Sequence, residues 1–312
     1  MAQYGNYIFK VDPAVKRTSV QYHNRYGIKL SADLYTRKDL DLNTPHPGLV
    51  LGGPNTTVKE QTSGLYANEL AKRGFVTIAF DYSFTGYSGG MPRNLDSPEI
   101  YVEDVSAAVD YLRTLRYVAA EQIGALGVCA SGGYFLSAAQ VDTRIKAVAT
   151  VSMYNPSDFS NLDDTQRAGM LADLAVQRDL DFAGDHPALG APFAPVQLEK
   201  AQVDAETWDL YEYYRTPRAY HPLDTTQITA TSYLPLLNFP MLTHLDWISP
   251  RPILLIAAEH APLKVIPEHV YQLAKEPKEL YIVPGAHHMD LYDKTDIIPF
   301  DKIDSFFKTH LA

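Results

Sequence analysis

The chain has 312 residues, of which 46% are hydrophobic, and a formal net charge of −10. This charge gives no basic footprint for nucleic acid or an anionic membrane surface, and no apolar run approaches the roughly 18 to 20 residues of a membrane span. A single cysteine excludes an intramolecular disulfide and suits a reducing compartment. The first ten residues lack the apolar core of a secretory signal, so we expect a cytoplasmic protein without nucleic-acid or membrane partners.

Short apolar runs alternate with amphipathic segments along most of the chain. Residues 17–36 alternate like two strands, with 24–27 as a hairpin turn. The later expected elements are a strand at 48–52, a helix at 61–73, a strand at 75–81, a helix at 99–116, strands at 123–127, 145–153, 253–257 and 280–283, and a final helix near 299–310. Short, continuously apolar strands between helices predict an α/β fold whose mostly parallel sheet is covered by helices on both faces.

Residues 155–248 interrupt this alternation. They are rich in Asp, Pro, Tyr and Leu, with helix-like pieces at 163–178 and 196–214 and no clear strand. We therefore predict two parts: a core formed by residues 1–154 and 249–312, and a helical cap, residues 155–248, over the active site. A peripheral helical elaboration is the alternative.

The most informative stretch is 123–135, Ile-Gly-Ala-Leu-Gly-Val-Cys-Ala-Ser-Gly-Gly-Tyr-Phe. An apolar run that breaks at a small-x-nucleophile-x-small pattern and continues into a helix has the form of a nucleophile elbow. Gly127 and Ser131 occupy the small positions around Cys129, and a helix N-terminus with a nearby histidine favours the reactive thiolate. Ser131 also has a small residue, Gly133, two positions ahead, so it is an alternative nucleophile. A small buried cysteine without chemistry is the structural alternative.

Residues 284–290, Pro-Gly-Ala-His-His-Met-Asp, follow the last apolar run. A histidine after the final strand is where this kind of sheet places its general base, and the Gly-Ala-x-His spacing selects His288 over His287. Metal binding by His287, His288 and Asp290 would need further ligands at recognisable spacing, and the sequence supplies none. We expect neither a metal nor another cofactor.

Two further groups complete the predicted site. Glu259 follows the 253–257 strand and is the nearest carboxylate to orient the histidine; a structural or solvent-facing glutamate is the alternative. An oxyanion hole should combine the Ala130 N–H with one from the loop after the 48–52 strand, around Asn55 and Thr56. Aromatic enrichment predicts an apolar pocket for a hydrophobic or aromatic acyl group, with residues Ser83, Phe84, Tyr87, Tyr220, His221, Tyr233 and Trp247 as its lining.

With these residues located, the chain resembles the α/β-hydrolase superfamily, in particular its dienelactone-hydrolase-like branch with a cysteine elbow. Several stretches are similar to bacterial and fungal hydrolases that include fungal polyketide transferases: residues 58–61, 74–81, 86–90, 215–222 and 283–286. The resemblance implies a hydrolase or acyltransferase with Cys129 as nucleophile and His288 as base. It also implies a small-molecule or carrier-bound acyl substrate, and homodimers are common among such folds.

The chain departs from these relatives at three places. A glycine-rich run is replaced by Asn-Thr-Thr at 55–57, Ser131 stands where a small or aromatic residue is usual, and residues 260–263 read His-Ala-Pro-Leu where relatives tend to carry Ala-His-Ser. Many hydrolases of this kind also have an aspartate at the position of Ala261. We predict an enzyme that cleaves or transfers an acyl group of an ester, lactone or thioester through Cys129. The alternatives are the same chemistry at Ser131, a non-hydrolytic cyclase or lyase, and a small-molecule binding protein.

Overall fold

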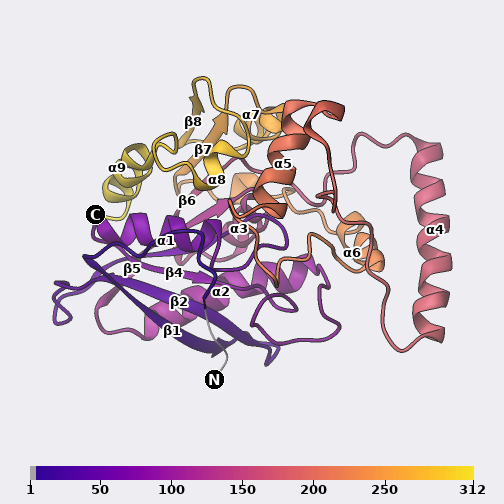
Figure 1. The fold of residues 1–312 in the computed structure, drawn as a ribbon. Coiled ribbons are helices and arrows are strands. Elements are labelled where there is room, and N and C mark those ends of the chain that lie inside the picture. Colours follow the sequence, from indigo (N-terminus) through magenta and orange to yellow (C-terminus); the bar gives the residue numbers. More distant parts are fainter. Residues whose placement is uncertain (1–4) are drawn as a thin grey trace.

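This computed structural model describes residues 5–312, which are organised around one mixed sheet. The prediction that the first ten residues are not a secretory signal concerns in part residues 1–4, which lie outside the described residues. The strands of the sheet run in the order β1-β2-β4-β3-β5-β6-β7-β8 (Figure 1). The strand bounds are β1 Val15–His23, β2 Lys29–Arg37, β3 His46–Gly52, β4 Val76–Phe80, β5 Val118–Val128, β6 Ile145–Val151, β7 Ile253–Ala258 and β8 Lys278–Val283. The pairs β1–β2 and β2–β4 are antiparallel and every other pair is parallel, so the predicted mostly parallel sheet is confirmed.

The N-terminal hairpin forms where its turn residues predict it. The backbone N–H of Gly27 donates to the carbonyl oxygen of Asn24, and the Asn24 side chain accepts from the N–H groups of Tyr26 and Ile28. Gly27 has a φ of 76°, in the left-handed region that glycine enters without strain. The turn therefore sets the register of β1 against β2.

Helices lie on both faces of the sheet. Their bounds are α1 Thr62–Lys72, α2 Pro98–Thr114, α3 Ser131–Val141, α4 Asp164–Ala183, α5 Ala205–Arg215, α6 Tyr233–Leu237, α7 Val265–Leu273, α8 Asp290–Asp293 and α9 Phe300–His310. A side chain at Gly124 would meet Phe307 of α9, whereas one at Gly127 would meet the backbone of Ser131 in α3. Because side chains alternate along a strand, α9 and α3 must cover opposite faces.

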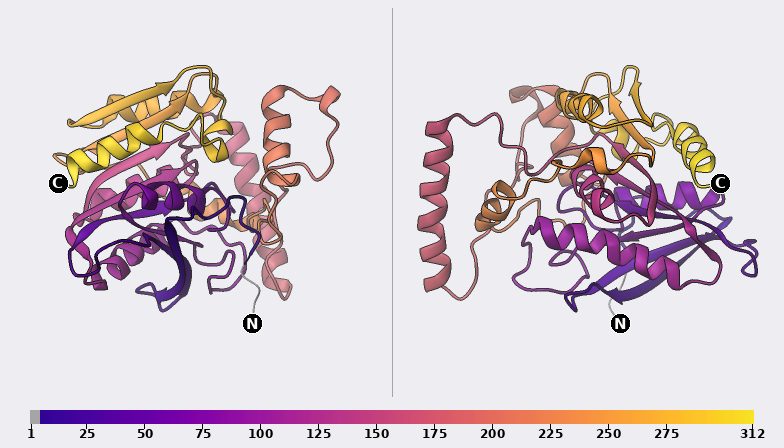
Figure 2. Two further views of the ribbon diagram at one scale, coloured as in Figure 1. Left: turned by 60° about the vertical axis from the view of Figure 1, so that its left-hand side comes forward. Right: turned by 180° about the vertical axis from the view of Figure 1, so that it is seen from behind.

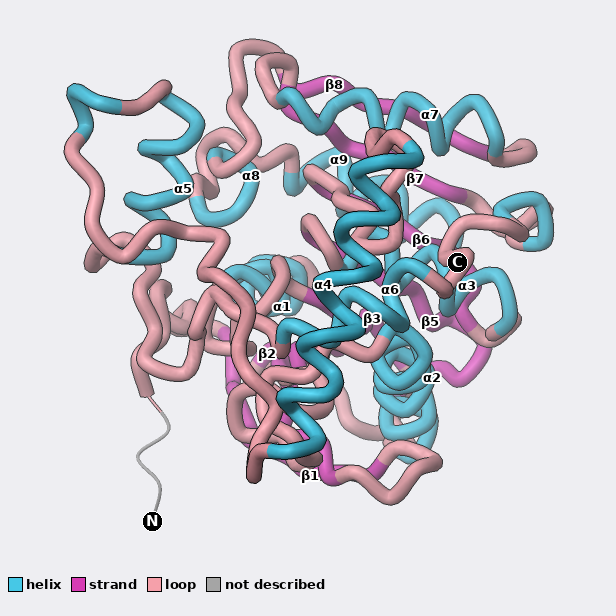
Figure 3. Tube along the Cα trace, turned by 90° about the vertical axis from the view of Figure 1, so that its right-hand side faces the viewer, coloured by secondary structure: helices cyan, strands magenta, loops and turns pink. Residues whose placement is uncertain are grey.

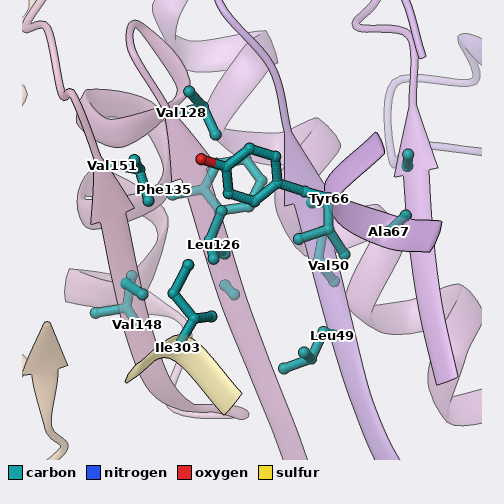
Figure 4. Packing of buried hydrophobic residues seen from close by; sticks show 14 of the residues in the cluster. Leu49, Val50, Tyr66, Ala67, Leu126, Val128, Phe135, Val148, Val151 and Ile303 are labelled. Carbon is teal, nitrogen blue, oxygen red and sulfur yellow. The ribbon is translucent and has the colours of Figure 1, made fainter. Parts of the chain in front are cut away.

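The buried core follows from the same alternation. Most apolar side chains of β3, β5 and β6 are buried, and Figure 4 shows several of them together with Tyr66 of α1 and Ile303 of α9. In α2, Val105, Ala108, Val109 and Leu112 are all buried, as their helical spacing predicts. No helix within residues 5–312 is long and apolar enough to cross a membrane.

The inserted segment, residues 155–248, joins β6 to β7 and contains α4, α5 and α6. Figures 2 and 3 show α4 on the outer side of the molecule, away from the sheet. The predicted helix over 196–214 is wrong in its first half, where only the short 3-10 turn Lys200–Gln202 forms. Helix α5 begins at Ala205 because the Asp204 carboxylate accepts the N–H of Thr207 and caps it there.

Hydrogen bonds fasten the inserted segment to loops of the sheet. The backbone N–H of Asp96 donates to the Ser232 hydroxyl, and that of Thr229 donates to the carbonyl oxygen of Asn94. The Asp96 carboxylate is buried and accepts from the Tyr134 hydroxyl at 2.7 and 2.9 Å. Burial raises the pKa of Asp96 to about 7, and the Tyr134 hydrogen bond opposes that rise.

Replacing Gly127 by alanine should destabilise the fold. A Cβ there would lie 2.3 Å from the carbonyl oxygen of Ser131, so the backbones of β5 and α3 would have to separate. We expect urea denaturation to show a loss of about 1–3 kcal/mol in the free energy of unfolding. Gly169→Ala in α4 is the control, because nothing lies within 4 Å of its Cβ position and alanine favours a helix. Equal stabilities of the two variants would contradict this account.

The buried carboxyl of Asp96 should make stability depend on pH. Because its pKa is higher in the folded state than in the unfolded chain, the folded protein keeps the proton and loses stability as pH rises toward 7. Between pH 5 and 8 we expect the wild type to lose about 3 kcal/mol relative to Asp96→Asn, measured by denaturant unfolding. Asp301→Asn, at a fully exposed carboxylate, should parallel the wild type.

Candidate active site

Cys129 occupies a strained turn between β5 and α3. Its φ is +55°, a left-handed conformation that is uncommon for a residue with a side chain. Its N–H donates to the carbonyl oxygen of Val151 at 3.0 Å, and its own carbonyl oxygen accepts from Gly132 and Tyr154 at 2.8 and 2.9 Å. Only 9% of the residue is exposed. The turn thus has the backbone shape of a nucleophile elbow, with the thiol ahead of the α3 N-terminus.

Two of the three predicted oxyanion residues meet at this thiol. The backbone N–H groups of Ala130 and Asn55 both hydrogen-bond to the Cys129 sulfur. The N–H of Thr56 instead donates to the side-chain oxygen of Asn55 at 3.0 Å, so it is not directed at the sulfur. An anion that forms beside the sulfur would therefore find the donors of Ala130 and Asn55.

The loop that carries Asn55 is held by a buried carboxylate of the inserted segment. Thr56 has a φ of 62°, and its hydroxyl donates to Asp224 at 2.6 Å. The same carboxylate accepts from the Gln61 side chain at 3.0 Å and from the N–H of Thr226 at 3.2 Å. Burial raises the pKa of Asp224 to about 6, against the opposing hydrogen bonds of Thr56 and Gln61. Sequence reasoning missed Asp224, since it lies 168 positions from Thr56 and belongs to no motif.

Ser131 is placed differently from Cys129. Its hydroxyl donates to the carbonyl oxygen of Gly53 and is hydrogen-bonded to the Tyr82 hydroxyl at 2.9 Å. The residue is fully buried and does not line the large cavity that Cys129 opens into. These contacts tie α3 to the loops after β3 and β4.

His288 lies on the loop after β8 and approaches Cys129 through a tyrosine. Its Nε2 is 3.1 Å from the hydroxyl of Tyr292, and that hydroxyl is also hydrogen-bonded to the Cys129 thiol. His288 is buried, and burial lowers its pKa to about 4. Burial also raises the pKa of the Cys129 thiol, although hydrogen bonds from Tyr292, Ala130 and Asn55 oppose this. At neutral pH the resting pair is therefore an uncharged thiol and an uncharged imidazole.

The structure does not bring Glu259 to this histidine. The Glu259 carboxylate is half exposed and accepts the N–H of Gly285 at 2.7 Å, which braces the turn before the histidines. The Nδ1 atom of His288 is buried and has no hydrogen-bond partner within residues 5–312. The predicted orienting contact is thus absent, because a carboxylate that holds a backbone turn at the surface cannot also reach the buried ring. His287 is exposed beside the site, and no group of three or more His, Cys, Asp or Glu in the described chain could hold a metal ion.

A cavity of about 550 Å³ opens over Cys129 and His288. Its aromatic lining comes mainly from β6's following loop, the inserted segment and α8: Tyr154, Phe193, Tyr214, Tyr233 and Tyr292. Its aliphatic lining is Pro156, Leu210, Ile228, Leu236, Leu263 and Met289, and its polar groups include Asn55, Asp204, Glu206 and Thr207. The cavity is large enough for a small-molecule ligand and mostly apolar, as such sites usually are.

Tyr233 is the one predicted pocket residue that lines this cavity. The loop after β4 turns its side chains elsewhere: Ser83 bonds to Asp104, Phe84 is buried, and Tyr87 lies over Lys59. Three predicted residues of the inserted segment also lie outside: Tyr220 and Trp247 are more than half exposed, and the buried His221 accepts the N–H of Leu223. Composition shows that aromatic residues are abundant, but it cannot show which of them line the cavity at Cys129.

Besides Asp224, sequence reasoning did not assign Tyr154, Tyr214 and Tyr292 to the site. For Tyr292 a signal existed, because it follows His288 by four residues and helical spacing would put both on one face. Tyr154 and Tyr214 carry no such signal, since their position depends on how the inserted segment packs over β6.

Comparison with known proteins agrees with this geometry. A family described as "alpha/beta hydrolase fold" matches residues 49–295. The uncharacterized protein PA2218 of Pseudomonas aeruginosa is 46% identical, covering 97% of this chain and 83% of its own. Its crystal structure matches with a TM-score of 0.95 at 44% identity, covering 99% of this chain and 98% of that chain.

Two fungal relatives carry functional names. Acyltransferase drtE of Aspergillus calidoustus is 25% identical over 89% of this chain and 89% of its own. Polyketide transferase ATR5 of Stachybotrys chlorohalonatus is 27% identical over 90% of this chain and 92% of its own. These names and the fold support the predicted class, a hydrolase or acyltransferase, and the predicted resemblance to fungal polyketide transferases is confirmed. By the family match and the PA2218 relationship, the chain belongs to the α/β-hydrolase family.

Proposed function

We propose that this protein transfers or hydrolyses acyl groups, with Cys129 as the nucleophile and His288 as the base. The observation that carries the proposal is the thiol itself: it sits on a left-handed turn, accepts two backbone N–H groups and opens into an apolar cavity. A thiol in that position can attack a carbonyl carbon while the two N–H groups receive the developing negative charge. The relatives named acyltransferase and polyketide transferase support the same chemistry.

The reaction proceeds in two halves. The Cys129 sulfur forms a bond to the carbonyl carbon of an ester, lactone or thioester, and His288 takes up the thiol proton. The carbonyl oxygen becomes an oxyanion at the N–H groups of Ala130 and Asn55. When this intermediate collapses, the bond to the leaving oxygen or sulfur breaks, and that atom receives the proton from His288. Water or a second nucleophile then releases the acyl group from the sulfur, with His288 accepting and returning one proton.

The substrate we infer has a hydrophobic or aromatic acyl part, either as a small molecule or on a carrier. Aromatic and aliphatic side chains make up most of the lining. Binding of an apolar ligand is favourable there because it removes apolar surface from contact with water. The polar groups Asp204, Glu206 and Thr207 in the lining supply orienting contacts for a hydroxyl or amine of the substrate. We place the reaction in the cytoplasm, because a single free thiol suits a reducing compartment.

A non-hydrolytic reaction, such as a cyclisation, is the second candidate. It is favoured by one observation: in the part of the chain that the structure describes, His288 Nδ1 has no acidic partner, and an orienting acid usually stabilises the imidazolium that hydrolysis requires. An intramolecular nucleophile held in the cavity would replace water in the second half of the reaction. This candidate still acylates Cys129, so product analysis of an activated hydroxyacyl thioester separates a lactone from a free acid.

Replacing Cys129 by alanine should abolish turnover. Since the sulfur makes the covalent bond, we expect p-nitrophenyl ester hydrolysis to fall at least about a thousandfold. Mass spectrometry of wild-type protein mixed with an activated ester should show an acyl adduct on the only cysteine. Full activity of Cys129→Ala would rule out the assignment.

Ser131→Ala is the matched control for the alternative nucleophile. It removes a buried hydroxyl that bonds to Gly53 and Tyr82, so we expect a loss of about 1–2 kcal/mol in unfolding free energy with the acyl adduct retained at Cys129. Loss of the adduct in this variant, with the fold intact by circular dichroism, would transfer the role to Ser131.

Asp224→Asn should lower kcat more than it raises KM. The carboxylate holds Thr56 and hence the loop that directs the Asn55 N–H, a group needed mainly when the oxyanion forms. We expect a loss of about ten- to a hundredfold in kcat, measured on the same ester. Asp246→Asn, a surface residue of the same segment that pairs with Lys275, should behave as the wild type. An unchanged kcat in Asp224→Asn would show that the loop with Asn55 keeps its conformation without this carboxylate.

A further inference from the structure

The nucleophile and the base are joined through a third side chain. The Tyr292 hydroxyl is hydrogen-bonded to the Cys129 thiol and lies 3.1 Å from Nε2 of His288. Within residues 5–312 no hydrogen bond links the thiol directly to the imidazole. A proton that leaves the sulfur for His288 therefore meets the phenol oxygen first.

Tyr292 is held firmly in this place. The residue is only 2% exposed, and its ring packs edge-on against those of Tyr213 and His288 at 5.1 and 5.4 Å. The Tyr214 hydroxyl is hydrogen-bonded to it, and the backbone before it is fixed by a bond from the Tyr66 hydroxyl to the carbonyl oxygen of Leu291. These contacts fix the position of the Tyr292 hydroxyl relative to Cys129 and His288.

We propose that Tyr292 carries the proton between Cys129 and His288. The inference rests on the proposed function, because it describes how that nucleophile is activated. The S–H bond of Cys129 breaks as its proton joins the Tyr292 oxygen, and the original phenol proton moves to Nε2 of His288. Tyr292 ends as it began, a neutral phenol, while the sulfur becomes a thiolate and the ring an imidazolium. The neutral ring that accepts this proton carries its own proton on Nδ1.

The surroundings of the pair explain why such a carrier is useful. Burial strongly disfavours a free phenolate at Tyr292, and a concerted shift never requires one. The thiolate accepts hydrogen bonds from the N–H groups of Ala130 and Asn55, and the imidazolium donates to the Tyr292 oxygen. No carboxylate reaches His288 Nδ1 within the described residues, so this short chain is the contact through which the ring is aligned with the sulfur.

The test is the rate at which iodoacetamide alkylates Cys129, followed by intact mass from pH 6 to pH 10. The other titratable groups at the cavity are Tyr154, Tyr214, Tyr233, Asp204 and Glu206, and they are the same in every protein compared. At pH 7, Tyr292→Phe and His288→Gln should each lower the rate about ten- to a hundredfold, and the double variant should fall no further, since the two groups act in series. At high pH, where the thiol ionises unaided, the rates should converge.

Tyr213→Phe is the matched control, because it also removes a buried hydroxyl from the aromatic cluster but one bonded to Thr62. It should alkylate at the wild-type rate across the whole pH range. Losses that add in the double variant, or a loss in Tyr292→Phe of equal size at every pH, would overturn the relay. Because alkylation reports the thiol directly, the relay can hold even if ester assays disprove acyl transfer, so the two failures are distinguishable.

Discussion

The left-handed turn at Cys129 is the constraint on which the rest of the site depends. A residue with a side chain keeps such a conformation only when its surroundings fix it. Here the Cys129 N–H donates to Val151 of β6, and its carbonyl oxygen accepts from Gly132 and Tyr154. The close approach of Gly127 to Ser131 lets α3 leave the strand at once. The thiol, the Ala130 N–H and the α3 N-terminus are consequently placed by the same few bonds.

Burial then determines the charge state of the site. It raises the pKa of the thiol and lowers that of His288, so the resting pair is neutral. Fixed donors are most effective in such a setting, because little water is present to screen them or to reorganise. The Ala130 and Asn55 N–H groups and the Tyr292 hydroxyl are donors of this kind. Within residues 5–312 no carboxylate reaches His288 Nδ1, so under the proposed function these donors are the main stabilising groups around Cys129 and His288.

The inserted segment contributes more than a covering. Its side chains supply much of the cavity lining, and its Asp224 reaches back to Thr56 on a loop of the sheet. Through that contact the segment that lines the cavity is coupled to the loop that carries the Asn55 N–H. Asp96 and Tyr134 strengthen the same junction near α3. The cavity lining and the loop that carries Asn55 are thus held by one set of buried polar contacts.

The amino-acid pattern by itself determined the strands, the mostly parallel sheet and the positions of Cys129 and His288, since these depend on local periodicity and on small residues at fixed spacing. It also located the inserted segment by the absence of strands. Only the tertiary structure decided that Glu259 braces a turn, that Ser131 is a buried tie, and that Tyr233 alone among the predicted pocket residues faces the cavity. The roles of Tyr292 and Asp224 arose there too, because a hydrogen bond between distant residues depends on how whole elements pack, which no local spacing encodes.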